Sequence, residues 1–431
     1  MDKEKLRQWL IPHRAKQTQA IAPGLYHYMQ DHDGLYTRFH LRVEPDGRGM
    51  LLANASAAAR LSPTGALMAK GLLDKQPEDE IVKSIKSRFK GATPEIIQAD
   101  LQQVKGIINR LVMPEDDYPI LNLDELNPTV FESELFAPLE ATVSLAPPEQ
   151  IVPLLNRLWE IGIPHITFFV PEKFDPVHLV RSVERAEDLG MIAGVRGRAT
   201  DLSHASLLAD LAQAGVDHVT VLVVAGGTAD HDTLCGRDDH EAVIALINDA
   251  YAQEVYPVAE IALIEGSVSS LQETLNNLIQ IGITTFSFFA IVAPDGMSDE
   301  ERDAALTAQA MPQTADWVEE ISNQLDVRFI WQPPVRRNPH QTLAEQVQQG
   351  PRSAGDAAVR IEADGRVIPP RGPYQAAGNI LSDDWQTIWD RDPFTRYRER
   401  VAEPTRCVDC PGLVICMADC PREPSGWASF R

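Results

Sequence analysis

The chain has 431 residues, of which 44% are hydrophobic, and its formal net charge is −23. This length exceeds what one core normally holds and predicts two or three globular domains, and the hydrophobic fraction excludes a disordered chain. The acidic balance argues against nucleic acid as the main partner, because an acidic surface repels phosphate backbones.

We expect a cytoplasmic protein without a membrane segment. No apolar run is long enough to span a bilayer, and the N-terminus mixes charges and lacks a signal-peptide core. In that reducing compartment a cluster of thiols indicates metal binding rather than disulfides.

Residues 1–35 are assigned to an N-terminal segment, and residues 36–112 are expected to form a compact module of strands followed by helices. Apolar and polar residues alternate over Thr37–Glu44, which predicts a strand. A turn at Pro45–Gly47 then leads into a second strand that starts at Gly49.

Three helices are expected in the rest of this module. Ser62 can cap a helix that Pro63 opens, and Pro77 and Pro94 open the next two. The last helix is expected to bury one apolar face. That face consists of Ile97, Leu101, Val104, Ile108 and Leu111.

This module resembles the PqqD-like family of peptide chaperones, also called the RiPP recognition element. The resemblance is carried by Leu51–Ala55, Arg60–Gly65, Leu72–Asp74, Glu80–Val82 and Phe89. It implies a winged-helix fold with three helices and a small sheet, to which the leader of a precursor peptide adds as an edge strand. Such pairing requires only an exposed strand with N–H and C=O groups to offer. A generic winged-helix structural domain is the alternative.

Residues 113–135 are assigned to a linker, and residues 136–332 repeat one theme of apolar strand, amphipathic helix and glycine. The glycines that end the helices are Gly162, Gly190, Gly215 and Gly282. Such glycines form left-handed caps, and the strand after each one joins a parallel sheet. These units predict either an open doubly wound sheet or a barrel. No G-x-G-x-x-G follows the first strand, so a dinucleotide site is not supported.

Four of the five cysteines lie in a C-x2-C-x5-C-x3-C run near the end of the sequence, at Cys407, Cys410, Cys416 and Cys420. Four soft sulfur ligands over so short a stretch suit an iron–sulfur cluster or a structural zinc. Zinc sites of this size usually use two short Cys-x2-Cys hooks, so the spacing favours iron and sulfide.

Residues 136–332 resemble the partial (β/α)6 TIM-like barrel of radical SAM proteins, and residues 333–431 resemble their SPASM extension. Ala137–Leu145 is similar to the first strand of that family. Val221–Ile244 is similar to its fourth strand with the loop and helix that follow. Ala354–Trp389, followed by the cysteine run, is similar to the SPASM region.

The motif that binds the catalytic cluster of this family is missing. The resemblance implies a [4Fe–4S] cluster, held by C-x3-C-x2-C after the first strand, to which S-adenosylmethionine binds. Here Leu145 is followed by Ala-Pro-Pro-Glu-Gln, and no cysteine precedes Cys235. The family's glycine-rich turn after the second strand is replaced by Val170–Phe174. We therefore expect a pseudo-radical SAM protein with no radical SAM catalytic residues and no S-adenosylmethionine cofactor.

The extension is reduced as well. Arg352 and Pro370 stand where SPASM proteins carry cysteines of a first auxiliary cluster. In the family the fourth cysteine of the run serves that first cluster. With that cluster lost, we infer that Cys420 completes one [4Fe–4S] cluster with the other three C-terminal cysteines, with zinc as the alternative. Such a fully ligated cluster would serve structure or electron transfer.

Several other residues invite a catalytic interpretation but are expected to be structural. Cys235 is predicted to fill an apolar position in a loop after a strand. His231 and Asp232 are expected to be ordinary loop residues, as the family resemblance implies. His165 and His218 begin buried strands and are predicted to be hydrogen-bonded core residues.

Charged residues near the barrel mouth leave two interpretations open. Glu172, Arg196 and Arg198 should lie near the carboxyl ends of strands, where this architecture places its sites. They are expected to be solvated, with a small polar ligand as the alternative. A run of arginines is similarly expected on the surface, with a basic face for an acidic peptide as the alternative. Its members are Arg328, Arg336, Arg337, Arg352, Arg360, Arg366 and Arg371.

The hypothesis from the sequence is a protein that binds a ribosomal precursor peptide or a radical SAM partner enzyme during peptide or cofactor maturation. It keeps the recognition module and the cysteine-rich tail but lacks the cluster that cleaves S-adenosylmethionine. Two alternatives are an electron-transfer protein that uses the tail cluster and an enzyme with other chemistry around Glu172 and Arg196. Nucleic acid and membrane are not expected as partners.

Overall fold

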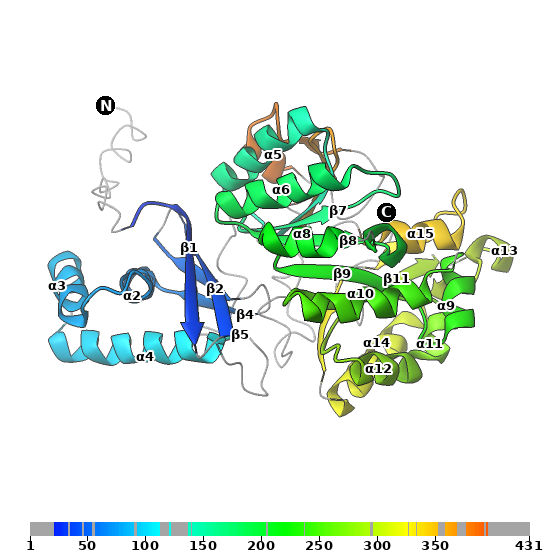
Figure 1. Cartoon of the computed structure of the whole chain (residues 1–431), viewed down its shortest axis with the longest axis horizontal. Helices are drawn as coiled ribbons and strands as arrows, with labels where there is room; N and C mark the ends of the chain where they lie inside the picture. The colour runs from blue at the N-terminus through cyan, green and yellow to red at the C-terminus, as the bar shows by residue number, and fades with distance from the viewer. Residues whose placement is uncertain are drawn as a thin grey trace, which may run out of the picture. The chain divides into compact units, whose positions relative to one another are not determined.

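The computed structural model describes most of the chain (Figure 1). The described residues are 21–32, 35–44, 47–53, 57–89, 93–112, 120–121, 137–138, 140–203, 206–236, 238–293, 296–325, 327–332, 334–351, 358–368, 376–391 and 394. Outside them lie the predicted ligands Cys407, Cys410, Cys416 and Cys420, so their arrangement stays a prediction.

The chain divides into two compact units. One consists of Met1–Ala53 and Ala57–Leu123, and the other of Asn54–Ser56 and Asp124–Arg431. We refer to them as the first and second units.

The first unit contains a five-stranded sheet with strand order β1-β2-β3-β4-β5. Its strands are β1 (Gly24–His32), β2 (Leu35–Val43), β3 (Gly49–Ala53), β4 (Ala57–Leu61) and β5 (Ile120–Leu121). The first four form antiparallel pairs, and β5 runs parallel to β4. β1 lies within residues 1–35, where no strand was expected. Tyr26 and Tyr28 of β1 pack against the core of the unit, so tertiary contact holds a strand that the sequence pattern did not reveal.

Three helices follow β4, as predicted: α2 (Pro63–Leu73), α3 (Glu78–Arg88) and α4 (Pro94–Val112). The Ser62 hydroxyl caps α2 by accepting the N–H of Gly65 at 3.1 Å. The five apolar residues expected on the last helix are buried in the core of this unit. The local signals of Ser62, Pro63 and the helical periodicity are therefore confirmed.

The second unit contains the predicted parallel sheet, which we call the barrel sheet. Its strands are β6 (Glu140–Ser144), β7 (His165–Phe169), β8 (Ile192–Gly197), β9 (His218–Val223), β10 (Tyr256–Leu263) and β11 (Thr285–Ala293). They are neighbours in chain order, and every adjacent pair is parallel. The strand–helix theme read from the sequence is therefore confirmed.

Helices connect these strands. They are α5 (Pro148–Ile161), α6 (Pro176–Asp188), α7 (Ala199–Leu202), α8 (Leu207–Gln213), α9 (Thr228–Cys235), α10 (His240–Ala252), α11 (Glu265–Ser269), α12 (Leu271–Gln280), α13 (Asp299–Arg302) and α14 (Met311–Gln324). The predicted left-handed glycines are confirmed, with φ of 89° at Gly162, 75° at Gly190, 96° at Gly215 and 97° at Gly282. Among the described helices, none combines the length and apolar character needed to cross a bilayer.

Short strands extend the barrel sheet at both ends. At one end β12 (Leu306–Thr307), β13 (Arg328–Trp331) and β14 (Val335–Arg336) each pair in parallel with β11. At the other end β15 (Ala358–Ile361) pairs in parallel with β6, and β16 (Arg366–Ile368) and β17 (Gly378–Asn379) follow antiparallel. The remaining helices are α15 (Leu343–Gln349) and α16 (Trp385–Trp389). The part of 333–431 that the structure describes is thus continuous with the barrel sheet.

The two faces of the barrel sheet differ in polarity. In β6, Ala141 and Val143 are fully buried and alternate with the less buried Thr142 and Ser144. The polar side of the sheet also carries Thr167, Arg196, His218, Thr220 and Glu260. Barrel interiors are usually filled with branched apolar residues, so this polar interior marks a candidate site.

Candidate functional site

The connection after the first barrel strand cannot hold a catalytic cluster. Only Leu145, Ala146 and Pro147 separate β6 from α5. The Leu145 N–H donates to the carbonyl oxygen of Phe169 at 3.0 Å, and Nε2 of His178 lies 2.7 Å from the carbonyl oxygen of Ala146. This connection has no thiolate to offer, and its backbone is tied to β7 and α6. The residues present therefore do not fit the cluster that binds S-adenosylmethionine.

The connection after the second barrel strand is an ordinary helix entry. The Val170 N–H donates to the carbonyl oxygen of Arg196 at 2.9 Å. Asp175 then caps α6, where its carboxylate accepts the N–H of Val177 at 3.0 Å. Glu172 lies between them and is exposed. The prediction that Glu172 is solvated is therefore confirmed, and the alternative that it binds a small ligand at the barrel mouth is not supported.

Arg196 is buried in an ion pair that the sequence did not reveal. Its Nε lies 3.0 Å from both carboxylate oxygens of Glu260, and its Nη2 also contacts that carboxylate. Arg196 is 8% exposed and Glu260 is 3% exposed. The two opposite charges neutralise each other across β9. Such pairing is what makes the burial of a charged side chain tolerable. Arg196 is thus accounted for without a ligand, and its predicted solvation is wrong.

A second arginine completes this charged layer. The guanidinium carbons of Arg196 and Arg360 lie 5.0 Å and 5.2 Å from the ring centre of Phe169. Arg360 Nε lies 3.3 Å from a carboxylate oxygen of Glu362, and Ser144 donates to the other oxygen at 3.1 Å. Positive and negative groups are therefore balanced in the layer. It ties β15 to the carboxyl ends of β6, β7 and β8.

Apolar side chains close the carboxyl end of the other half of the sheet. Leu343 and Val347 of α15 belong to one buried cluster that also contains Leu222 of β9, Ala262 of β10 and Phe289 of β11. In this architecture ligands bind at the carboxyl ends of the strands. At β9–β11 that position is taken by the chain's own helix.

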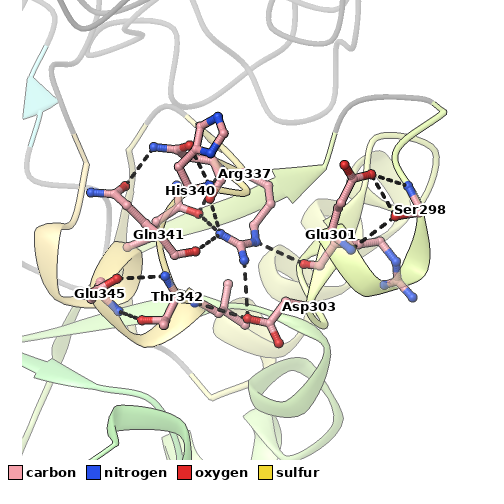
Figure 2. Close-up of polar contacts among 12 residues, drawn as sticks. Ser298, Glu301, Asp303, Arg337, His340, Gln341, Thr342 and Glu345 are labelled. Carbon is pink, nitrogen blue, oxygen red and sulfur yellow. Dashed lines mark hydrogen bonds and ion pairs between the residues drawn. The ribbon is translucent and has the colours of Figure 1, made fainter.

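Arg337 fixes the segment that carries α15 (Figure 2). Its Nη1 donates to the carbonyl oxygen of Gln341 at 2.7 Å and to Oε1 of Gln346 at 2.7 Å. Its Nη2 lies 3.3 Å from a carboxylate oxygen of Asp303, which also accepts the N–H of Leu343. Arg337 is 4% exposed, so the predicted surface position for it, and for the equally buried Arg360, is wrong. Neither arginine contributes to a basic face.

A glycine lets this segment approach the charged layer. Gly350 follows α15 with φ of 66°, and a Cβ built there would lie 2.0 Å from Nη2 of Arg196. The carbonyl oxygen of Gln349 accepts from Nη1 of Arg360 at 3.1 Å. The end of α15 therefore packs directly on the guanidinium groups. Together the charged layer and α15 occupy the mouth of the barrel sheet.

Cys235 and His231 form a buried pair rather than a reactive site. The Val224 N–H donates to Nδ1 of His231 at 3.2 Å, so the ring carries its proton on Nε2. That nitrogen lies 3.3 Å from Sγ of Cys235, which therefore accepts. Cys235 is the last residue of α9, not a loop residue, and it packs in the apolar cluster under α15 as predicted.

Asp232 is also structural. Its carboxylate accepts the N–H groups of Asp239 and His240 at 2.8 Å and 3.0 Å, at the start of α10. These bonds hold the pKa of Asp232 below its usual value. Asp232 therefore anchors the start of α10. Both His231 and Asp232 lie in helix α9, so their prediction as loop residues is wrong.

A polar cluster lies at the amino ends of the barrel strands. Oγ1 of Thr167 lies 3.3 Å from a carboxylate oxygen of Glu140 and 3.4 Å from Nε2 of His218. The rings of His165 and His218 meet edge to face at 4.9 Å. Burial lowers the pKa of His165 to about 4 and that of His218 to about 3, and burial raises the pKa of Glu140. His218 matches the prediction of a hydrogen-bonded core residue. For His165 that prediction is wrong, because the residue is only half-buried and its Nε2 has no hydrogen-bond partner within the described part of the chain.

Gly194 creates the space for this cluster. A Cβ at Gly194 would lie 2.0 Å from Nε2 of His218, so the ring lies directly against the backbone of β8. Across the described residues, no three His, Cys, Asp or Glu side chains are arranged to hold a metal ion. Thr167 and His218 are buried, so the cluster is a polar part of the core.

The buried roles of two residues at the mouth, Glu260 and Arg337, were not predicted from the sequence. Glu260 is the only charged residue in β10, and an isolated charge in an apolar strand is a detectable signal for a buried partner. Arg337 had no comparable signal, because it lies in a run of arginines whose other described members include the exposed Arg336. Only the tertiary structure shows that Arg337 is buried while its neighbour Arg336 is exposed.

No protein-family model matches the sequence, and no curated protein sequence matches it. Among solved structures, the chain is similar to SuiB from Streptococcus suis bound to S-adenosylmethionine, with a TM-score of 0.51 and 14% sequence identity over 89% of this chain and 94% of SuiB. SuiB bound to its precursor peptide SuiA gives a TM-score of 0.50 and 14% identity over 92% of this chain and 95% of that chain. At this identity the likeness concerns the fold alone. The chain shares its fold with SuiB, a mixed α/β architecture with a parallel sheet.

Proposed function

We propose that this chain binds a peptide or a partner enzyme in peptide or cofactor maturation and does not itself cleave S-adenosylmethionine. The observation that carries the proposal is the connection of three residues between β6 and α5. It contains no cysteine, and hydrogen bonds to β7 and α6 fix its backbone. A radical SAM-type fold that lacks the place for its cluster suits binding better than catalysis.

The state of the barrel mouth supports this proposal. Arg196 is neutralised by Glu260, and α15 covers the carboxyl ends of β9–β11. Glu172, the other residue named for repurposed chemistry, is exposed and does not join Arg196. No specific observation favours an enzyme with other chemistry in the mouth.

The peptide-binding part of the proposal rests on the first unit. Its antiparallel sheet with three helices agrees with the winged-helix recognition module proposed for residues 36–112. A sheet edge can accept an extended peptide through main-chain hydrogen bonds. SuiB, similar in fold over most of its length, has been solved with a precursor peptide bound. We therefore propose a ribosomal precursor peptide as the partner, in the cytoplasm.

The C-terminal cysteines are proposed to hold one [4Fe–4S] cluster, with zinc as the alternative. Metal and sulfide analysis of protein purified without oxygen distinguishes them. Iron and sulfide in the ratio of one [4Fe–4S] cluster are expected, and Cys410→Ala should lose both. Cys235→Ala is the matched control, because this buried thiol packs in the core. Stoichiometric zinc without sulfide would overturn the cluster and also remove the electron-transfer alternative.

Peptide binding is tested by selection from a display library of random short peptides on the full chain. Enriched peptides should slow amide hydrogen exchange along an edge strand of the first unit, because added main-chain hydrogen bonds protect those amides. A scrambled version of each enriched peptide is the control. Failure to enrich any peptide, or protection confined to the second unit, would contradict the proposed recognition role.

A further inference from the structure

The turn that follows α13 has a strained backbone. Asp303 and Ala304 are consecutive residues with φ of 49° and 59°, in the left-handed region that favours glycine. A helix often ends on one left-handed residue, usually glycine, but here two other residues adopt that conformation in succession. The start of α13 is regular, since Ser298 and Glu301 form a capping box (Figure 2). The strain is therefore confined to the end of this short helix.

The residues that follow β14 form one body with α15. The side-chain oxygen of Gln346 accepts from Nη1 of Arg337 at 2.7 Å and from the N–H of Asn338 at 3.0 Å. Arg337 also donates to the carbonyl oxygen of Gln341 at 2.7 Å (Figure 2). These bonds join the two ends of the stretch to each other, so it can move as a unit. We call residues 338–349 the lid.

A weak polar link joins the lid to the turn after α13. One carboxylate oxygen of Asp303 lies 3.3 Å from Nη2 of Arg337 and accepts the N–H of Leu343 at 3.3 Å. Both distances exceed the separation of about 2.9–3.0 Å that is usual for such bonds. The Asp303 side chain is 54% exposed, so water competes for the same oxygen. The residue that bears backbone strain thus also supplies polar bonds that hold the lid.

We propose that the lid opens over the barrel mouth and that the turn at Asp303–Ala304 is its strained latch. Opening breaks the bonds of Asp303 and frees the turn to leave the left-handed region, so released strain offsets part of the lost contacts. Gly350, with φ of 66°, is the hinge at the far end. The buried side chains of Leu343 and Val347 keep the closed state dominant.

The surface under the lid indicates what the open state accepts. Leu222, Ala262 and Phe289, at the ends of β9–β11, pack in the same apolar cluster as the lid. An opened lid bares these side chains, which suit an apolar side chain of a ligand rather than a charged group. This inference goes beyond the proposed function, and its failure leaves peptide binding by the first unit untouched.

Amide hydrogen exchange in α15 of the full chain measures how often the lid opens. Ala304→Gly relieves strain in the closed state and removes no side-chain bond, so it should slow exchange in α15 about threefold. Glu254→Gly is the matched control, because Glu254 follows α10 in the same unit with a left-handed φ of 58°. It should leave exchange in α15 unchanged. Equal exchange in the two variants would overturn the strained latch.

Weakening the latch should have the opposite effect. Asp303→Asn keeps the size of the side chain and its tolerance of the left-handed region but removes the charge, so α15 should exchange about threefold faster. This variant should also bind more 8-anilinonaphthalene-1-sulfonate, a dye for apolar surface, than Glu300→Gln, an exposed change in α13. Equal exchange or equal dye binding in these two variants would overturn the inference. Exchange of α15 at the rate of β10 in every form would overturn it as well, because the lid would then open only by global unfolding.

Discussion

The barrel mouth and the edge of β4 differ in how their polar groups are satisfied. At the mouth, Arg196, Arg337 and Arg360 each bond to groups of the same unit, and α15 fills the remaining apolar space. At the edge, main-chain pairing joins β4 to β5 at the described positions Ala58 and Ala59. The polar groups of the mouth are paired with one another, which supports our proposal that the barrel sheet is a scaffold and that the first unit carries recognition.

The largest expected effect comes from breaking the charged layer. Arg196→Met leaves the Glu260 carboxylate buried without its partner and should lower the free energy of unfolding of the second unit by about 3–5 kcal/mol. Urea denaturation measures it. The double variant Arg196→Met/Glu260→Leu should recover most of the loss. If both variants are equally destabilised, the layer is not held by charge pairing.

Opening the apolar closure should have the next largest effect. Leu343→Ala removes buried volume between α15 and the ends of β9–β11 and should cost about 3 kcal/mol. Leu381→Ala, at a position 39% exposed, is the control and should change the free energy of unfolding by less than about 0.5 kcal/mol. A loss no larger than that of the control would show that α15 does not seal the mouth.

The amino-end cluster makes the second unit sensitive to acid. Burial, together with the charge of His165, lowers the pKa of His218 to about 3, whereas an unfolded histidine titrates near about 6.5. Between the unfolded pKa of about 6.5 and the folded pKa of about 3, His218 is protonated in the unfolded chain but not in the folded chain. The stability present above pH 6.5 is therefore lost as pH falls, by about 2 kcal/mol at pH 5. Glu140, whose pKa burial raises, acts in the opposite sense and partly offsets this loss.

Replacing the histidine isolates its share of the pH effect. His218→Asn should remove about 2 kcal/mol from the difference in unfolding free energy between pH 7.5 and pH 5. His340→Asn, at an exposed position, should leave that difference unchanged. Identical pH profiles for both variants would contradict a buried neutral His218.

The smallest expected loss of stability concerns the first unit, next to β4. Ser62 directly follows β4 and caps α2, so Ser62→Ala should cost about 1 kcal/mol. Amide exchange in α2 measures this loss. Ser87→Ala, at an exposed position of α3, is the control and should be nearly neutral. Equal exchange in both variants would mean that the Ser62 cap does not stabilise α2.

Local chemistry made much of the fold predictable. Ser62, Pro63 and Gly162 act through the backbone of their own turn, so their roles follow from a few neighbouring residues. The barrel strands were likewise visible as apolar runs after the glycines. The mouth was not predictable in this way. Arg196 and Glu260 are 64 residues apart, and they meet only because β8 and β10 flank β9.

The same limit applies to α15. Its short sequence carries helix signals, including the capping box of Thr342 and Glu345 (Figure 2). These signals do not predict which strand ends the helix covers. Arg337 and Asp303 come together through the pairing of β14 with β11 and the turn after α13. Contacts between distant segments therefore decided the site, whereas the lack of cysteines before Cys235 can be read directly from the sequence.

Reductive cleavage of S-adenosylmethionine tests the central claim most directly. The anaerobically purified chain, with iron and sulfide restored, is incubated with dithionite and S-adenosylmethionine, and 5′-deoxyadenosine is quantified. We predict no more product than Cys410→Ala protein gives under the same conditions, because the β6–α5 connection offers no cluster ligands. Product that rises in proportion to the parent chain and is lost in Cys410→Ala would show that this chain is itself a radical SAM enzyme.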